Sequence, residues 1–342
     1  MLCVLTFLAF LTGSLCDDSD GGVAFRIPLN DGNAIPALGF GTFLGLDENG
    51  MRPPGDHEAE YPVKWALEAG YRLLDTAVTY QTEGQVGSAW RASGIPREDV
   101  FIVTKLSTSE SRNVVASLRG SLARLNMSYV DLYLIHSTIT IKPDYTGYDI
   151  IDYLDTWKGM EEVKRLGLAR SIGISNFNVS QIQRLLANCE IKPTVLQVEV
   201  NLNLAQNKLV DYCKSQDIVV MAYAPFGSLF SRDPPPRPPA PRYNDPILVE
   251  MANKHNKTTP QIVLRYLVQR GLVPIPKSVK RPRIQQNIQI FDFQLTEEEI
   301  QTLSEFNRDY RIFFPTFWQN HPYYPFERVD KPGPSFFKGQ GY

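Results

Sequence analysis

Several features are scarce or absent in this chain, and each absence excludes a class of protein. Only four of the 342 residues are cysteines, and none stands in a Cys-x-x-Cys or Cys/His spacing typical of a metal site. The net charge is −2, whereas nucleic-acid binding requires a clustered basic surface. The one conspicuous apolar run, residues 1–15, is too short to span a bilayer comfortably. No G-x-G-x-x-G follows the first expected strand, which argues against a Rossmann fold.

The apolar run at the N-terminus is interpreted as a secretory signal peptide covering residues 1–16. Its apolar core spans residues 5–11, and Ser14 and Cys16 place small residues at the −3 and −1 positions of a cleavage site. An ordinary N-terminal strand or an uncleaved anchor is the alternative, since no Lys or Arg lies near Met1. We expect the chain to be secreted or to reside in the lumen of the secretory pathway. Three sequons support this location and suggest a glycoprotein, at Asn126, Asn178 and Asn256.

The mature chain, residues 17–342, is expected to be a single domain. Its composition, 43% hydrophobic and 21% charged, suits one large core or two small domains. Cleavage leaves two cysteines, Cys189 and Cys213. A secreted protein can pair them, but a large core does not need such a cross-link, and we expect free, buried thiols.

Strand and helix patterns alternate along most of the chain. Apolar runs on both sides of an Asn-Asp-Gly turn at residues 30–32 predict a hairpin before the first repeat. Eight repeats of strand then helix fit a closed (β/α)8 TIM barrel of the α/β class better than an open doubly wound sheet. The strands are expected at 38–43, 71–74, 100–104, 131–135, 171–174, 195–198, 218–222 and 272–275. The helices are expected at 56–69, 83–92, 109–125, 150–165, 180–187, 206–215, 246–254 with 260–270, and 296–306, the last opened by a capping box at Thr296.

Three successive strands end in ionisable side chains. Asp75 follows the second strand, with Tyr80 in the turn beyond it; Lys105 follows the third strand and His136 the fourth. The C-terminal ends of barrel strands meet on the face where barrel enzymes carry their chemistry, so these four side chains should converge. Each also has an ordinary interpretation: Asp75 as a helix cap, Tyr80 as packing, Lys105 as a side chain extending to solvent and His136 as a satisfied buried imidazole.

The set resembles the catalytic tetrad of the aldo-keto reductases, and the four residues fall at the family's four positions. The resemblance runs from residue 23 to the end of the chain and implies a barrel plugged at its bottom by the hairpin. It implies that hydride passes from NADPH to a carbonyl carbon while Tyr80 acts as general acid. Lys105 would lower the pKa of Tyr80 from about 10, Asp75 would hold Lys105, and His136 would orient the carbonyl oxygen of the substrate.

Further segments match the cofactor-binding residues of the same family. Ser175, Asn176 and Gln197 would hold the nicotinamide carboxamide, and Tyr223 would stack on the nicotinamide ring. A cation, a hydroxyl and a guanidinium on the last barrel loop suit the adenosine 2′-phosphate, which favours NADPH over NADH; a basic helix start on the surface is the alternative. The remaining matches are Thr42 and Ser228 toward the cofactor and its pyrophosphate, Lys277, Ser278 and Arg283 toward the 2′-phosphate, and Gln286 with Asn287 beside them.

Two irregular regions complete the expected site. The proline-rich stretch 227–244 predicts a stiff flap over the pyrophosphate, with Arg237 or Arg242 facing phosphate; a disordered linker is the alternative. The tail, residues 311–342, is rich in Phe, Tyr and Pro and would form a wall for an apolar substrate, unless it is docked without a role. Phe43 would border the substrate or serve only as core. The tail candidates are Trp318, His321, Tyr323, Tyr324 and Phe326.

Two positions near the expected substrate pocket differ from those of animal family members. Ser107 and Ser137 stand where animal members of the family often carry Trp and an aromatic or Pro, so the family's substrate preferences do not transfer safely. The signal peptide together with the fold resembles the secreted insect 3-dehydroecdysone 3β-reductases, which suggests a ketosteroid. A reductase of small aldehydes or sugars and a non-catalytic NADPH-binding barrel are the alternatives. We expect a monomer that acts on a small carbonyl compound.

Overall fold

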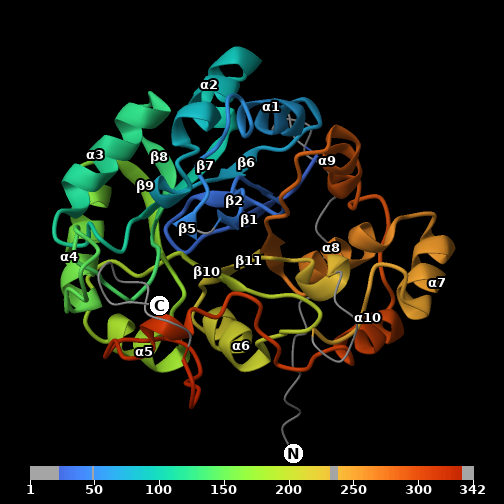
Figure 1. The fold of residues 1–342 in the computed structure, drawn as a ribbon. Coiled ribbons are helices and arrows are strands. Elements are labelled where there is room, and N and C mark those ends of the chain that lie inside the picture. Colours follow the sequence, from blue (N-terminus) through green and yellow to red (C-terminus); the bar gives the residue numbers. More distant parts are fainter. Residues whose placement is uncertain (1–22, 48–49, 232–237, 333–342) are drawn as a thin grey trace, which may run out of the picture.

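The computed structural model describes residues 23–47, 50–231 and 238–332, and its centre is a ring of eight parallel strands (Figure 1). Each barrel strand pairs with the next in chain order. The ring closes where the amides of Gly39 and Gly41 donate to the carbonyls of Pro274 and Pro276, both at 3.0 Å. The predicted (β/α)8 barrel is confirmed. Its strands are β3 (Phe40–Gly41), β6 (Leu73–Asp75), β7 (Phe101–Leu106), β8 (Val130–Ile135), β9 (Ala169–Ser175), β10 (Val195–Glu199), β11 (Val219–Tyr223) and β12 (Leu272–Pro274).

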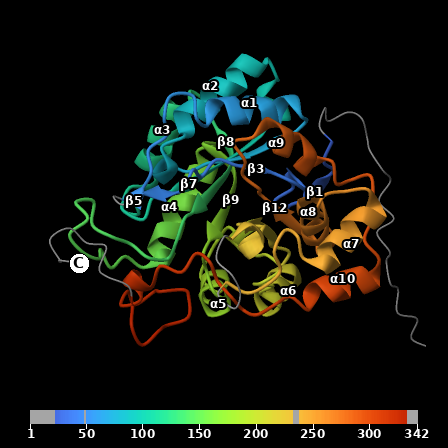
Figure 2. The same ribbon diagram turned by 45° about the vertical axis from the view of Figure 1, so that its right-hand side comes forward.

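Helices surround this ring on all sides, as Figures 1 and 2 show. Gly87 lies on the helix Glu83–Ser93, at its contact with the helix Val114–Leu125. A Cβ at Gly87 would lie 2.1 Å from the carbonyl oxygen of Leu125, so the close approach of these two helices requires glycine. The capping box predicted at Thr296 is present, with Glu299 as its partner. The helices are α1 (Glu60–Glu68), α2 (Glu83–Ser93), α3 (Val114–Leu125), α4 (Tyr153–Arg165), α5 (Val179–Leu186), α6 (Asn207–Ser215), α7 (Pro246–His255), α8 (Thr259–Gln269), α9 (Arg281–Ile288) and α10 (Glu297–Ser304).

The hairpin predicted before the barrel is confirmed, and it closes one end of the ring. β1 (Arg26–Pro28) pairs antiparallel with β2 (Ala34–Pro36). Leu29 and Ile35 are buried in the same apolar cluster as the side chains that fill the barrel. Asn30 Nδ2 donates to the carbonyls of Pro193 and Asp217, both at 3.0 Å, which precede β10 and β11. The hairpin therefore covers the N-terminal ends of the strands and leaves the C-terminal ends for chemistry.

The structure also contains two elements that the sequence patterns did not predict. One is the short hairpin of β4 (Leu46–Asp47) and β5 (Gly50–Met51), and the other is α9. α9 buries only Ile284, Asn287 and Ile288, so its apolar stripe is too narrow to stand out in the sequence. Several predicted helices begin later than expected; α4, for example, starts at Tyr153 because the Asp152 side chain accepts the amide of Leu154 and caps it.

Some predictions concern residues that the structure does not describe or that prove less buried than expected. The signal peptide, residues 1–16, and Arg237 lie outside the described ranges. Within them, Cys189 and Cys213 are free thiols, but only Cys213 is buried and Cys189 is partly exposed. No cluster of metal-ligating side chains occurs in the described part of the chain. No helix within residues 23–47, 50–231 and 238–332 is long and apolar enough to cross a membrane.

The three sequons lie in different surroundings. Asn126 and Asn256 are exposed at the C-terminal ends of α3 and α7. Asn178 instead caps α5, where its Oδ1 accepts the amide of Gln181 and its Nδ2 donates to the carbonyl of Pro325 at 3.3 Å. Asn178 is only partly exposed and its Nδ2 is engaged with Pro325, whereas Asn126 and Asn256 are exposed, so this sequon is the least suited of the three to glycosylation.

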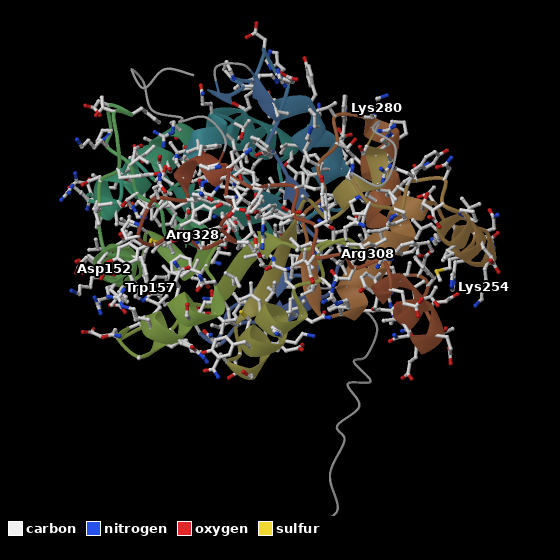
Figure 3. All side chains as sticks on the ribbon, turned by 60° about the horizontal axis from the view of Figure 1, so that its bottom comes forward. Asp152, Trp157, Lys254, Lys280, Arg308 and Arg328 are labelled. Carbon is white, nitrogen blue, oxygen red and sulfur yellow. The ribbon has the colours of Figure 1, made fainter. Side chains whose placement is uncertain are left out.

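The C-terminal segment, residues 307–332, runs past α6 and lies beside α5 in Figures 1 and 2. Arg308 and Arg328, labelled in Figure 3, lie near its two ends. Tyr324 packs with Ile139 and Ile141, which follow β8, and Trp318 and Phe326 lie against this cluster. His321 is fully buried, and its ring contacts the amides of Thr140 at 3.3 Å and Tyr323 at 3.1 Å. His321 thus joins the segment to the loop after β8.

The burial of His321 predicts a pH-dependent stability. Burial lowers the pKa of His321 to about 4, from 6.5 when unfolded, so its contribution is complete above pH 6.5 and is lost as the pH falls toward 4. When the pH is lowered from 7 to 5, the free energy of unfolding of the unmodified protein should fall by about 2 kcal/mol more than that of His321→Gln. Chemical denaturation at the two pH values measures this. His57→Gln, at an exposed histidine, is the control, and an unchanged pH dependence in His321→Gln would contradict the assignment.

Candidate active site

Asp75 and Lys105 form a buried ion pair at the C-terminal ends of β6 and β7. Lys105 Nζ lies 2.8 Å from both carboxylate oxygens of Asp75 and 2.9 Å from the carbonyl oxygen of Thr76. The Lys105 side chain is 0% exposed and that of Asp75 is 3% exposed. Burial lowers the pKa of Lys105, and the charge of Asp75 opposes that change. The three acceptors use all three ammonium hydrogens, so the pair is satisfied within the protein.

Tyr80 and His136 complete the group. The turn of 3-10 helix Val78–Tyr80 follows β6 and places the Tyr80 ring over the ammonium of Lys105, with 4.9 Å between Nζ and the ring centroid. The Tyr80 hydroxyl lies 3.5 Å from Nε2 of His136, and the Tyr80 and Phe43 ring centroids are 5.1 Å apart. The structure therefore brings together the four residues predicted as the tetrad, with Phe43 at their edge.

The predicted acidification of Tyr80 is wrong for this arrangement. Burial raises the pKa of Tyr80 well above 10, and the negative charge of Asp75 raises it further. Lys105 does not reverse this, because its hydrogens are bonded to Asp75 and Thr76 and the ion pair has no net charge. A phenol with a raised pKa keeps its proton at neutral pH, so Tyr80 is a proton donor in its protonated form.

His136 is neutral at physiological pH. Burial lowers the pKa of His136 to about 3, and the positive charge of Lys105 contributes to the change. Thr79 Oγ1 lies 3.5 Å from Nδ1 of His136, on the opposite side of the ring from Tyr80. A neutral imidazole carries one N–H, which suits it to donate a hydrogen bond to a carbonyl oxygen without supplying the transferred proton.

Amide and hydroxyl groups from β9, β10 and β11 are connected to this group by hydrogen bonds. Asn176 has a left-handed backbone (φ 58°), its Nδ2 donates to the carbonyl of His136 at 2.9 Å, and its Oδ1 accepts from the Tyr223 hydroxyl at 2.9 Å. Ser175 Oγ accepts from Asn176 Nδ2 at 3.2 Å. Gln197 Nε2 donates to Asp75 Oδ1 at 2.7 Å. This donor and acceptor set has the chemistry that a nicotinamide carboxamide requires.

The residues expected to bind phosphate lie on the opposite side of the barrel mouth. Thr42, Lys277 and Ser278 line one shallow depression, although the Thr42 hydroxyl itself donates to the carbonyl of Asp75 at 2.9 Å. Arg283 lies on α9 with its guanidinium 5.7 Å from the centroid of the exposed Phe230 ring. α9 also carries the exposed Gln286 and the buried Asn287. The hydroxyl of Ser278 and the ammonium of Lys277 at this depression fit a phosphate group, and Arg283 is a further cation on the helix that follows.

The flap residues occupy different positions from those predicted. The Ser228 hydroxyl is buried between two acceptors, Asn203 Oδ1 and the carbonyl oxygen of Pro239 at 2.7 Å, and its single hydrogen bonds to one of them at a time, so it holds the loop in place. The guanidinium of Arg242 donates to the carbonyls of Pro238 and Pro239 at 2.7 and 2.6 Å, and so stabilises the flap itself. These bonds hold Arg242 against its own loop, and its contact with phosphate stays a prediction.

The predicted substrate wall is met in part. Phe43 lies at the tetrad, whereas Trp318 packs in the separate cluster around Ile139 and Tyr324. Ser107 and Ser137 are buried, and their hydroxyls bond within their own loops, Ser107 to Ser109 Oγ at 3.0 Å and Ser137 to the amide of Ile139 at 3.2 Å. The oxygen atoms of these two serines are therefore engaged within their own loops.

Two contacts at the site involve residues that sequence reasoning did not single out. Phe313 of the C-terminal segment meets the Tyr223 ring edge-on, with 6.2 Å between ring centroids. Glu199, the last residue of β10, is fully buried beside Tyr223. A glutamate at the end of an apolar strand was a usable signal, but its partners come from a segment more than a hundred residues away.

A cavity of about 440 Å³ lies behind the C-terminal segment and not at the tetrad. Asn178, Leu209, Arg311 and Phe326 contribute to its lining. Asn176 is shared with the amide network, but Asp75, Tyr80, Lys105 and His136 do not line the cavity. We place the chemistry at the tetrad because the charged and hydrogen-bonded groups meet there.

Known proteins resemble this chain over most of its length. Residues 37–308 match the aldo/keto reductase family. Aldo-keto reductase AKR2E4 of the silkworm Bombyx mori is 48% identical over 305 residues, covering 87% of this chain and 97% of that protein. Human aldo-keto reductase family 1 member C4 is 40% identical over 322 residues, covering 88% and 97%.

Solved structures agree with these matches. The crystal structure of silkworm AKR2E4 in complex with NADP has a TM-score of 0.83 and 47% identity, covering 88% of this chain and 99% of the other. The structure of AKR2E5 complexed with NADPH has a TM-score of 0.87 and 40% identity, covering 92% and 97%. The donor set at the barrel mouth fits the same cofactor. The chain belongs to the aldo/keto reductase family and is an NADP-dependent oxidoreductase that acts on carbonyl and alcohol groups.

Proposed function

We propose that this enzyme reduces a bulky, largely apolar ketone, and that ketosteroids such as 3-dehydroecdysone are its substrate class. The observation that carries this proposal is the aromatic and apolar border of the site. Phe43 lies at the Tyr80 ring, and Phe313 lies at the Tyr223 ring. Such a border favours a large apolar body over a sugar, which would leave its hydroxyls without hydrogen-bond partners.

The residues of the tetrad have distinct proposed roles in that reduction. His136 donates a hydrogen bond to the carbonyl oxygen and orients it, and Tyr80 supplies the proton. Asp75 and Lys105 form the buried ion pair beneath the Tyr80 ring. When bound, NADPH supplies the hydride for the carbonyl carbon. Ser175, Asn176 and Gln197 hold its carboxamide and Tyr223 its ring, while the other contacts come from Thr42, Lys277, Ser278, Arg283, Gln286 and Asn287.

A substrate panel tests the proposal. NADPH consumption, followed by absorbance, is measured with ketosteroids, including 3-dehydroecdysone, with aldoses and with short aldehydes. We expect the highest kcat/KM for a ketosteroid, because only such a substrate covers the aromatic border. If no ketosteroid is turned over while short aldehydes are, the substrate proposal is wrong and the small-aldehyde alternative replaces it.

A further inference from the structure

Glu199 holds the beginning of the C-terminal segment at the cofactor side of the site. Its carboxylate accepts the backbone amides of Ile312 at 2.9 Å and Phe313 at 2.8 Å, one on each oxygen. Asn201 Nδ2 adds a third hydrogen bond at 3.2 Å. The Glu199 side chain is 0% exposed. A buried carboxylate is costly unless such donors satisfy it, so its presence fixes the position of these two amides.

The segment held in this way contacts Tyr223 directly. Glu199 and Tyr223 are paired residues at the ends of the neighbouring strands β10 and β11. The Phe313 ring meets the Tyr223 ring at 85°, an edge-on geometry that aromatic pairs favour. The Tyr223 hydroxyl in turn donates to Asn176, whose side chain donates to the carbonyl of His136. A continuous series of contacts therefore runs from Glu199 to the tetrad.

The position of Glu199 distinguishes it from buried carboxylates that only stabilise the fold. Glu161 on α4 is such a residue: it is buried, and its carboxylate accepts the amides of Glu190 at 2.7 Å and Ile191 at 2.9 Å. Both amides bond the same oxygen of Glu161, Oε1, whereas Glu199 uses one oxygen for each amide. Of these two buried carboxylates, only Glu199 holds a backbone that touches the site, so Glu161 serves as a control remote from the cofactor.

We propose that Glu199 is a positioning residue for cofactor binding, which acts by fixing residues 312–313 so that Phe313 holds the Tyr223 ring in the orientation that receives the nicotinamide. This inference rests on the proposed role of Tyr223. Glu199 itself touches neither cofactor nor substrate in this account. The carboxylate of Glu199 thereby links the C-terminal segment to the nicotinamide side of the site.

The central experiment compares Glu199→Gln with Glu161→Gln. A glutamine offers one acceptor in place of two and turns an NH2 group toward the second amide, so residues 312–313 lose their fixed position. We expect the Kd for NADPH, measured by quenching of protein fluorescence, to rise about tenfold in Glu199→Gln, with a matching fall in kcat/KM. Glu161→Gln can keep its bonds to both amides through the remaining oxygen, and its Kd should not change. Equal Kd values for Glu199→Gln and the unmodified enzyme, or equal increases in both variants, overturn the proposal.

A second variant keeps the proposal testable if Glu199→Gln does not fold. Phe313→Ala leaves the carboxylate and both backbone hydrogen bonds in place and removes only the contact with Tyr223. It should raise the Kd for NADPH, and the double variant with Glu199→Gln should be no worse than the more impaired single variant, because both act through one contact. Multiplied effects in the double variant would show that Glu199 acts by another route and overturn the proposal.

One further variant separates this inference from the proposed function on which it rests. Tyr223→Leu should weaken NADPH binding if Tyr223 contacts the nicotinamide. An unchanged Kd in Tyr223→Leu means that the role assigned to Tyr223 is wrong. Loss of binding in Tyr223→Leu without any effect of Glu199→Gln or Phe313→Ala means that the role of Tyr223 stands and the positioning role of Glu199 fails. All of these readouts are independent of which ketone is the substrate.

Discussion

Replacing Tyr80 by phenylalanine is expected to lower kcat for ketone reduction by about 10²–10⁴-fold, the usual contribution of a positioned general acid. The substitution removes only the hydroxyl, which lies 3.5 Å from His136, and keeps the ring that covers Lys105 and contacts Phe43. The Kd for NADPH should therefore change little. Steady-state kinetics and fluorescence quenching measure the two quantities separately.

Tyr133→Phe is a matched control for this experiment. Tyr133 is a fully buried tyrosine on β8 whose hydroxyl has no hydrogen-bond partner among the described residues. Removing that hydroxyl should leave kcat unchanged. A Tyr80→Phe enzyme with undiminished kcat would show that another group supplies the proton, and loss of NADPH binding in the same variant would show that the substitution disturbed the cofactor site instead.

Replacing Lys105 by methionine is expected to lower the free energy of unfolding by about 3–5 kcal/mol. The substitution leaves the carboxylate of Asp75 buried, and among the described residues Gln197 is the one side-chain donor that still bonds it. Turnover should fall as well, because Tyr80 loses the group beneath its ring. Chemical denaturation followed by circular dichroism measures the change in stability.

A double substitution and a surface control identify the cause. Asp75→Asn combined with Lys105→Met removes the uncompensated charge, so most of the lost stability should return while turnover stays low. Lys158→Met breaks the exposed pair with Asp155 and should leave the denaturation midpoint almost unchanged. If Lys105→Met unfolds at the same denaturant concentration as the unmodified protein, the ion pair does not stabilise the fold as described.

The repeat of strands and helices was predictable from the sequence because each element carries its own periodicity. The eight barrel strands begin and end within two residues of their predicted bounds. The Asp-Gly pair at residues 31–32 predicted the hairpin turn. α9 escaped prediction because a helix that buries one narrow face leaves few apolar residues in the sequence. The position of Trp318 could not be predicted, because the C-terminal segment has no periodicity that fixes its course. Only the structure shows that Trp318 packs against the cluster around Ile139.

The sequence by itself determined that Asp75, Lys105 and His136 would meet, because parallel strands in a closed barrel must end on one face. Only the tertiary structure decided the chemical state of that group. The ammonium of Lys105 is fully bonded to Asp75 and Thr76, so burial dominates and the pKa of Tyr80 rises instead of falling. The hydrogen-bond partners of Glu199 could not be predicted from the sequence either. A pKa and a hydrogen bond both depend on distances between groups that lie far apart along the chain.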